Sequence, residues 1–128
     1  MKSPSLLASF RFAFEGIAYA FRTQRNFKVH CGVMLAVVIV GLVVGLSVEQ
    51  WAILALVSGL VFQAELMNTA LEAVVDHVSP EFHALAKVAK DCAAGAVFLT
   101  ALCAVVVGLL VLGPPLLRAL AAALRAGA

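Results

Sequence analysis

Charged residues are scarce in this chain. Only 12% of its 128 residues are Asp, Glu, Lys or Arg, whereas 64% are apolar, and the mean hydropathy is +1.09. Globular domains carry about 25% charged residues, so this composition excludes an ordinary water-soluble domain and predicts an all-α integral membrane protein. Basic blocks interleaved with aromatic residues are also missing, and we therefore expect no nucleic-acid partner.

Several familiar motifs are absent as well. The three cysteines, Cys31, Cys92 and Cys103, lack C-x-x-C spacing and lie in apolar stretches, which predicts reduced thiols with a packing role. Neither G-x-x-x-x-G-K-[ST] nor the G-x-G-x-x-G and H-R-D motifs of soluble kinases occur, and the hydrolase motifs G-x-S-x-G and H-E-x-x-H are missing too. We expect no cleaved signal peptide, because charged residues recur from Arg11 to Lys28.

Long uncharged runs predict a single membrane domain, 1–128, with three transmembrane helices preceded by an interfacial amphipathic helix. A Ser79-Pro80 start and a Gly113-Pro114-Pro115 stop bound the last span. The expected segments are an interfacial helix at 5–25, spans at 29–48, 50–76 and 80–112, and a tail at 116–128 that either lies on the far surface or is disordered.

The distribution of cations predicts the orientation. Lysines and arginines flank the start of the first span and precede the third, whereas the turn between the first two spans has none. By the positive-inside rule, the N-terminus and the second loop are cytoplasmic. The polar residues that this places at the cytoplasmic edge are Glu72, Asp76, Glu81, Lys90 and Asp91.

An acidic stripe occupies the second span. Glu65, Asn68, Glu72 and Asp76 follow one another at i, i+3, i+7 and i+11, so they share one helix face. Glu65 lies about 22 Å along the helix from Gln50, which places it below the far membrane surface and Glu72 near that surface. Acids at such a depth bind ions, relay protons or perform chemistry, although a polar clamp between helices would also explain them.

Carboxylates and a lysine at one membrane edge match the requirements of phosphoryl transfer: oxygen ligands for a hard cation, positive charge for phosphates, and a base for a hydroxyl proton. A small transporter coupled to protons or cations would use an intramembrane acid equally well. A non-catalytic packing protein is the third alternative, and the residue types alone leave all three open.

Three strings carry a resemblance to a known family. They are E-L-M-N-T-A-L-E-A-V-V-D at 65–76, V-S-P-E-F-H-A-L-A-K-V-A-K-D-C-A-A-G-A-V at 78–97, and F-R-F-A-F-E-G-I-A-Y-A-F-R-T-Q-R-N at 10–26. They resemble the small bacterial membrane lipid kinases, diacylglycerol kinase and undecaprenol kinase, and are more similar to the undecaprenol kinase branch. The resemblance implies a homotrimer of three-span subunits in the bacterial cell membrane, with shared active sites that use ATP and Mg²⁺ to phosphorylate the primary hydroxyl of undecaprenol or diacylglycerol.

The resemblance also implies roles for individual residues. Glu65 matches the general base, Asn68 a polar neighbour in the site, and Glu72 a magnesium ligand. The matches to the nucleotide-binding segment and its edge are Asp76, Glu81, His83, Lys90 and Asp91, and the matches to the lipid entrance are Phe10 and Phe14, with Glu65 at the bound lipid. The chain departs from the family at Gln24, where an acid usually supplies a second metal ligand.

Overall fold

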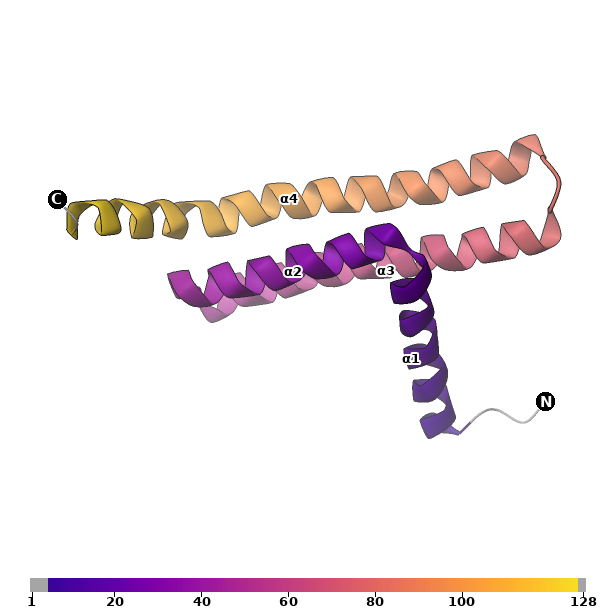
Figure 1. Ribbon diagram of the computed structural model, residues 1–128, viewed down its shortest axis with the longest axis horizontal. Helices are drawn as coiled ribbons and strands as arrows, with labels where there is room; N and C mark the ends of the chain where they lie inside the picture. The colour runs from indigo at the N-terminus through magenta and orange to yellow at the C-terminus, as the bar shows by residue number, and fades with distance from the viewer. Residues whose placement is uncertain (1–4, 127–128) are drawn as a thin grey trace.

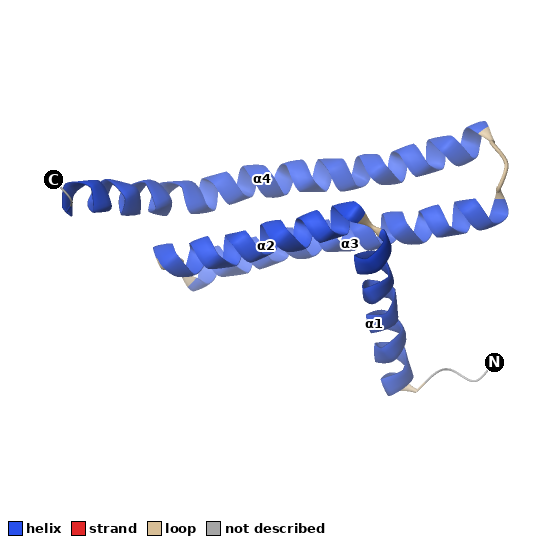
Figure 2. Cartoon of the chain, viewed as in Figure 1, coloured by secondary structure: helices blue, strands red, loops and turns tan. Residues whose placement is uncertain are grey.

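Four α-helices make up the computed structural model, which describes residues 5–126 (Figure 1). The helices are α1 (Leu6–Thr23), α2 (Arg25–Val44), α3 (Val48–Val78) and α4 (Ala84–Ala126). Figure 2 shows helices joined by short loops, with no strand in the described part of the chain. α2, α3 and α4 run alongside one another, and α1 projects crosswise from them (Figure 1).

The prediction of three spanning helices is confirmed, because α2, α3 and α4 are each long and apolar enough to cross a membrane. α1 forms as a helix close to the predicted range, with the Ser5 side chain accepting a hydrogen bond from the Ala8 backbone at 3.3 Å. Its position in the headgroup plane stays a prediction, as does the homotrimer.

The turn between α2 and α3 is specified by short-range chemistry. Gly45 ends α2 in the left-handed region, at φ 70°, which glycine adopts without a steric penalty. Ser47 and Gln50 then form a capping box at the start of α3: the Ser47 hydroxyl accepts from the Gln50 backbone, and Gln50 Oε1 accepts from the Ser47 backbone at 2.9 Å. The predicted polar turn is therefore present, and the spans end and begin a few residues from the expected 29–48 and 50–76.

The helix of the third span starts later than predicted. We expected its helix to open at Ser79-Pro80, but α4 begins at Ala84 after a short loop. Ser79 instead caps the C-terminus of α3, at φ −136° and ψ 70°. At the start of α4, Nδ1 of His83 accepts a hydrogen bond from the backbone N–H of Leu85 at 3.2 Å. The Ser79-Pro80 motif does not start a helix here because α3 continues to Val78 and Ser79 is its C-cap.

The helix of the third span also extends further than predicted. We expected Gly113-Pro114-Pro115 to stop the helix at 112, but both prolines lie inside α4, which continues to Ala126. The described part of the predicted tail, 116–126, is therefore helical, and its last two residues lie outside the described range.

A contact from another helix compensates for one of these prolines. Pro115 has no N–H to donate to the Val111 carbonyl one turn earlier, which would leave that oxygen unsatisfied. The Nε2 of Gln50, on α3, donates to this carbonyl at 3.4 Å. Gln50 thus serves two structures at once, the α3 capping box and the proline-containing turn of α4. The prediction that the prolines end the helix considered one helix alone, and it could not take into account a hydrogen-bond donor from a different helix.

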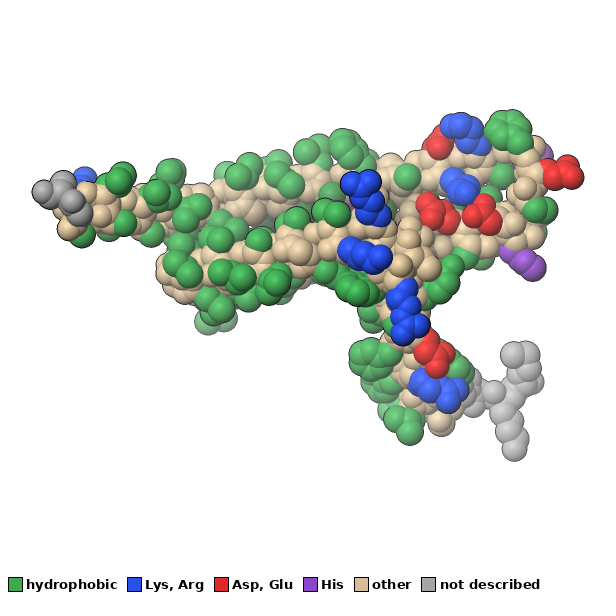
Figure 3. Space-filling model, viewed as in Figure 1, with side chains coloured by type: hydrophobic (Ala, Val, Ile, Leu, Met, Phe, Trp, Pro, Cys, Tyr) green, Lys and Arg blue, Asp and Glu red, His purple; other side chains and the backbone are tan. Residues whose placement is uncertain are grey.

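The apolar core of the single chain is thin. Its buried apolar residues are Ala20, Phe27, Leu54, Val61 and Val97. α3 packs mainly against α4, and α2 meets α3 through the Phe27–Phe62 ring pair, whose centroids are 5.2 Å apart. Figure 3 shows hydrophobic side chains exposed over most of α2, α3 and α4, whereas acidic and basic side chains gather near α1 and near the loop that joins α3 to α4. Such an apolar exterior suits lipid or neighbouring subunits.

We expect Gln50→Ala to lower the free energy of unfolding by about 1–2 kcal/mol, because it removes the capping acceptor and the donor to Val111 together. Gln50→Glu is the comparison variant: it keeps the acceptor for Ser47, removes the donor to Val111 and adds a negative charge beside that carbonyl. Pro115→Ala restores an N–H for the Val111 carbonyl, so Gln50→Ala should cost less in that background. Denaturation of the four variants in detergent measures these differences, and equal costs of Gln50→Ala in both backgrounds would contradict the contact.

Candidate active site

The acidic stripe of α3 runs from buried to exposed positions, as predicted. Glu65 is buried, with 2% of its surface exposed, whereas 65% of the Asp76 side chain is exposed. Asn68 and Glu72 lie between them and are partly buried. One α-helix therefore presents carboxylates at graded depths because the 3, 4 and 4 residue steps keep them on one face.

The Glu72 carboxylate is the centre of a polar cluster. Asn68 Nδ2 donates to its Oε1 at 3.1 Å, and Gln24 Nε2 donates to its Oε2 at 3.5 Å. Gln24 reaches this point because it is the single extended residue between α1 and α2, with φ −95° and ψ 118°. The structure thus brings Gln24 to Glu72 across 48 positions of sequence.

His30 was not among the predicted site residues, although it lies beside Glu65. Its Nε2 is 3.2 Å from Glu65 Oε1, at ion-pair distance when the imidazole is protonated. The approach lacks the alignment of a hydrogen bond, so Glu65 Oε1 is buried with no hydrogen-bond partner among residues 5–126. Matching depths could have revealed the pair, because His30 lies about 7.5 Å into α2 and Glu65 was expected several ångströms below the same surface.

An ion pair links α3 to α4 at the exposed end of the stripe. Lys90 Nζ, near the polar start of α4, lies 2.8 Å from Asp76 Oδ1. Lys87 pairs with Asp91 one turn along α4. The predicted nucleotide segment therefore forms two adjacent ion pairs.

The remaining predicted residues lie apart from this cluster. Glu81 and His83 are exposed in the loop before α4, and no ion pair joins either side chain to Lys90 or Glu72 in the described part of the chain. Phe10 and Phe14 are exposed on α1, at 57% and 68%, and line neither of the cavities described next. Their predicted roles at the nucleotide and the lipid entrance stay predictions.

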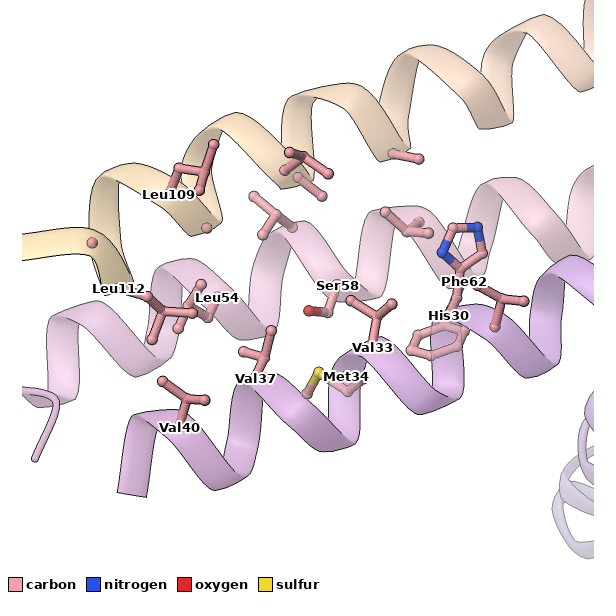
Figure 4. Close-up of a pocket in the computed structure, with 18 of the residues that line it drawn as sticks. His30, Val33, Met34, Val37, Val40, Leu54, Ser58, Phe62, Leu109 and Leu112 are labelled. Carbon is pink, nitrogen blue, oxygen red and sulfur yellow. The ribbon is translucent and has the colours of Figure 1, made fainter. Parts of the chain in front are cut away.

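An apolar cavity of about 470 Å³ lies between α2, α3 and α4 (Figure 4). Figure 4 shows His30 and Phe62 at one end and Val40 and Leu112 at the other. His30 and Ser58 are the lining residues with polar side chains, and the others are apolar or glycine. His30 also borders a second, smaller hollow of about 270 Å³ that includes Asn26. His30 is therefore the polar residue that borders both spaces.

The Glu72 cluster offers oxygen atoms suited to Mg²⁺. Asn68 Oδ1 is buried and accepts no hydrogen bond from residues 5–126, so it is available as a ligand beside the Glu72 carboxylate. Within that range no group of three His, Cys, Asp or Glu side chains is placed to hold a metal. One carboxylate with two amides fits a hard cation that also binds the oxygen atoms of a nucleotide's phosphates.

Comparisons with known proteins all point to one family. Residues 11–112 match the sequence profile of the family described as prokaryotic diacylglycerol kinase. A Synechocystis diacylglycerol kinase is 53% identical over 116 residues, which cover 90% of this chain and 66% of that protein. The Bacillus subtilis undecaprenol kinase is 45% identical over 108 residues, 84% of this chain and 88% of that protein. A Haemophilus influenzae diacylglycerol kinase is 34% identical over 102 residues, 78% of this chain and 84% of that protein.

We expect Gln24→Glu to strengthen divalent-metal binding in the presence of ATP, because the new carboxylate would stand beside Glu72 and add a charged ligand. The metal concentration at half-saturation should fall by roughly tenfold, which corresponds to about 1.4 kcal/mol. Mn²⁺ titration followed by electron paramagnetic resonance measures it. Thr23→Glu is the matched control, since it adds the same charge one residue away. Superimposable curves for Gln24→Glu and the unmodified protein would place Gln24 outside the metal's ligands.

Proposed function

Because this chain belongs to the prokaryotic diacylglycerol kinase family, we propose that it is an ATP- and Mg²⁺-dependent membrane lipid kinase. The substrate hydroxyl is the primary alcohol of undecaprenol, another polyprenol, or diacylglycerol, and Glu65 is the general base. The observation that carries the proposal is the position of Glu65: a buried carboxylate that reaches an apolar cavity through His30 and shares its helix face with Glu72.

Glu65 is suited to accept a hydroxyl proton. It is 2% exposed, and its Oε1 has no hydrogen-bond partner among the described residues, so its capacity as an acceptor is unused. A lipid hydroxyl at the polar end of the cavity would meet this carboxylate, and removal of its proton would make the oxygen a stronger nucleophile toward the γ-phosphoryl group of ATP. No covalent intermediate on the protein is required.

The residues toward the exposed end of the stripe would hold the nucleotide. Glu72, Asn68 and Gln24 would hold Mg²⁺, which when bound neutralises charge on the phosphate oxygens. Lys90, oriented by Asp76 at 2.8 Å, would contribute a positive charge to the phosphates from α4. Catalysis of this kind depends on positioning and charge stabilisation, which two helices joined by an ion pair can provide.

The apolar cavity would hold the substrate's hydrocarbon chain. It extends along α2 from His30 to Val40, about 15 Å, with an almost entirely apolar lining, and its polar end is next to Glu65. The cavity would thus fix the direction in which the substrate binds, with its hydroxyl next to His30 and its chain among valine and leucine side chains.

The choice between the two lipids rests on the sequence. Relatives named diacylglycerol kinase and undecaprenol kinase are both similar to this chain, and undecaprenol is favoured by the resemblance of residues 10–26. We also propose a homotrimer with shared sites and a cytoplasmic active site. The cation distribution supports the orientation, and the extensive exposed apolar surface gives neighbouring subunits an area to cover.

The test is a phosphorylation assay on the purified protein. In detergent or lipid, with Mg²⁺ and ATP labelled in the γ-phosphate, we expect label to appear in undecaprenol, in diacylglycerol or in both. Folding is checked in parallel by the helical circular dichroism spectrum. A folded protein that transfers phosphate to neither lipid would refute the kinase and return the transporter and packing protein to consideration.

Two conservative variants separate the proposed roles. Glu65→Gln should lower turnover by at least 10²–10⁴-fold, roughly the contribution of general-base catalysis, and leave ATP binding within a few-fold. Glu72→Gln should instead weaken Mg²⁺-dependent nucleotide binding. Steady-state kinetics and nucleotide titration give both quantities. Equal and mild losses in the two variants would indicate a structural polar clamp rather than a base and a metal ligand.

A further inference from the structure

The imidazole of His30 joins the buried carboxylate to a second space. We propose that His30 is a proton relay: it takes from Glu65 the proton that Glu65 removes from the substrate hydroxyl and releases it to water through the hollow beside Asn26. The inference rests on the proposed kinase function and assigns to His30 a role that acts through Glu65.

The chemistry requires an exit for a proton. When a lipid alcohol attacks the γ-phosphorus of ATP, the new P–O bond forms as the bond to the ADP oxygen breaks, and the hydroxyl proton is left behind. Near neutral pH the phosphate ester and ADP do not retain that proton, so each turnover leaves one proton on the base. Glu65 must lose it before the next substrate can react, but its carboxylate is almost fully buried.

His30 is placed to take it. Its Nε2 lies 3.2 Å from Glu65 Oε1, and this oxygen has no other partner among the described residues. The His30 side chain is 22% exposed, against 2% for Glu65, so the proton moves from an almost fully buried group to a less buried one that borders the smaller hollow. The transfer converts the neutral imidazole to imidazolium and the carboxylic acid to carboxylate, and it leaves an ion pair that persists until the imidazolium loses its proton.

The hollow beside His30 supplies the exit. It has a volume of about 270 Å³, and Asn26, one helical turn before His30 on the same face of α2, is its polar lining residue besides His30. The α4 side contributes Ala94, Val97, Phe98 and Ala101, none of which titrates. Glu65 on α3 is the charged group at ion-pair distance from His30 in the described chain, and no α1 residue pairs with it. Among the described residues Glu65 is therefore the proton partner of His30 within the protein, and the proposed relay releases the proton into the hollow.

Two variants of His30 distinguish a proton relay from a role in which His30 only orients Glu65. His30→Gln keeps an amide that can donate to Glu65 but cannot carry a proton, whereas His30→Ala opens a space continuous with the hollow. We expect both to lower kcat by roughly tenfold or more, with KM for ATP and lipid within about twofold. Added imidazole should restore kcat in His30→Ala and not in His30→Gln. Substituted imidazoles should restore it in order of their basicity.

Control variants show whether any effect of imidazole depends on His30 and Glu65. Cys31→Ala, next to His30 but outside both cavity linings, should keep the unmodified rate and ignore imidazole. In His30→Ala combined with Glu65→Gln, imidazole should have no effect because the base is missing. Near-normal kcat in His30→Gln, or a loss in His30→Ala that no imidazole restores, overturns the relay. If His30→Ala does not fold, His30→Gln alone decides. An unmodified protein that phosphorylates no lipid refutes the kinase itself, a different result.

Discussion

The constraint on which the structure depends is the free energy of a carboxylate inside the membrane. An acid at the centre of a spanning helix costs about 2.5–3.5 kcal/mol on insertion scales, so Glu65 must face other protein groups rather than lipid. The fold meets this condition by placing α2 so that His30 approaches to 3.2 Å. The same burial leaves the carboxylate short of hydrogen bonds, a condition better suited to a reacting base than to a packing contact.

Polar contacts join the helices at both ends of the bundle. At one end Gln50 donates to the carbonyl that Pro115 leaves unsatisfied, and at the other Lys90 pairs with Asp76. Between them the helices meet through apolar side chains around a cavity, and little of the single chain's surface is buried. Directional contacts therefore set the register of the helices, because dispersion alone among valines and leucines would allow them to slide.

The charge in the proposed nucleotide site is distributed unevenly. Glu72 is the one carboxylate of its cluster, and both partners that donate to it are amides, Asn68 and Gln24. Where the family usually has a second acid, this chain has a neutral side chain that can orient Glu72 but adds no charge. The metal would then depend strongly on the nucleotide's own phosphates, which couples metal binding to nucleotide binding. In the proposed site, Lys90 on α4 would supply positive charge for the phosphates.

The sequence by itself determined the membrane class, the three spans and the acidic face of α3, because these follow from composition and from the 3.6-residue period, which are local properties. It also placed Glu65 deeper than Glu72 by counting helical rise. Tertiary structure decided the rest: that α4 continues through its prolines, that Gln24 meets Glu72, and that His30 stands beside Glu65. Each of these depends on a partner from another helix, and such contacts between distant positions leave no period or spacing in the chain; the matching depths of His30 and Glu65 are the one sequence signal for any of them.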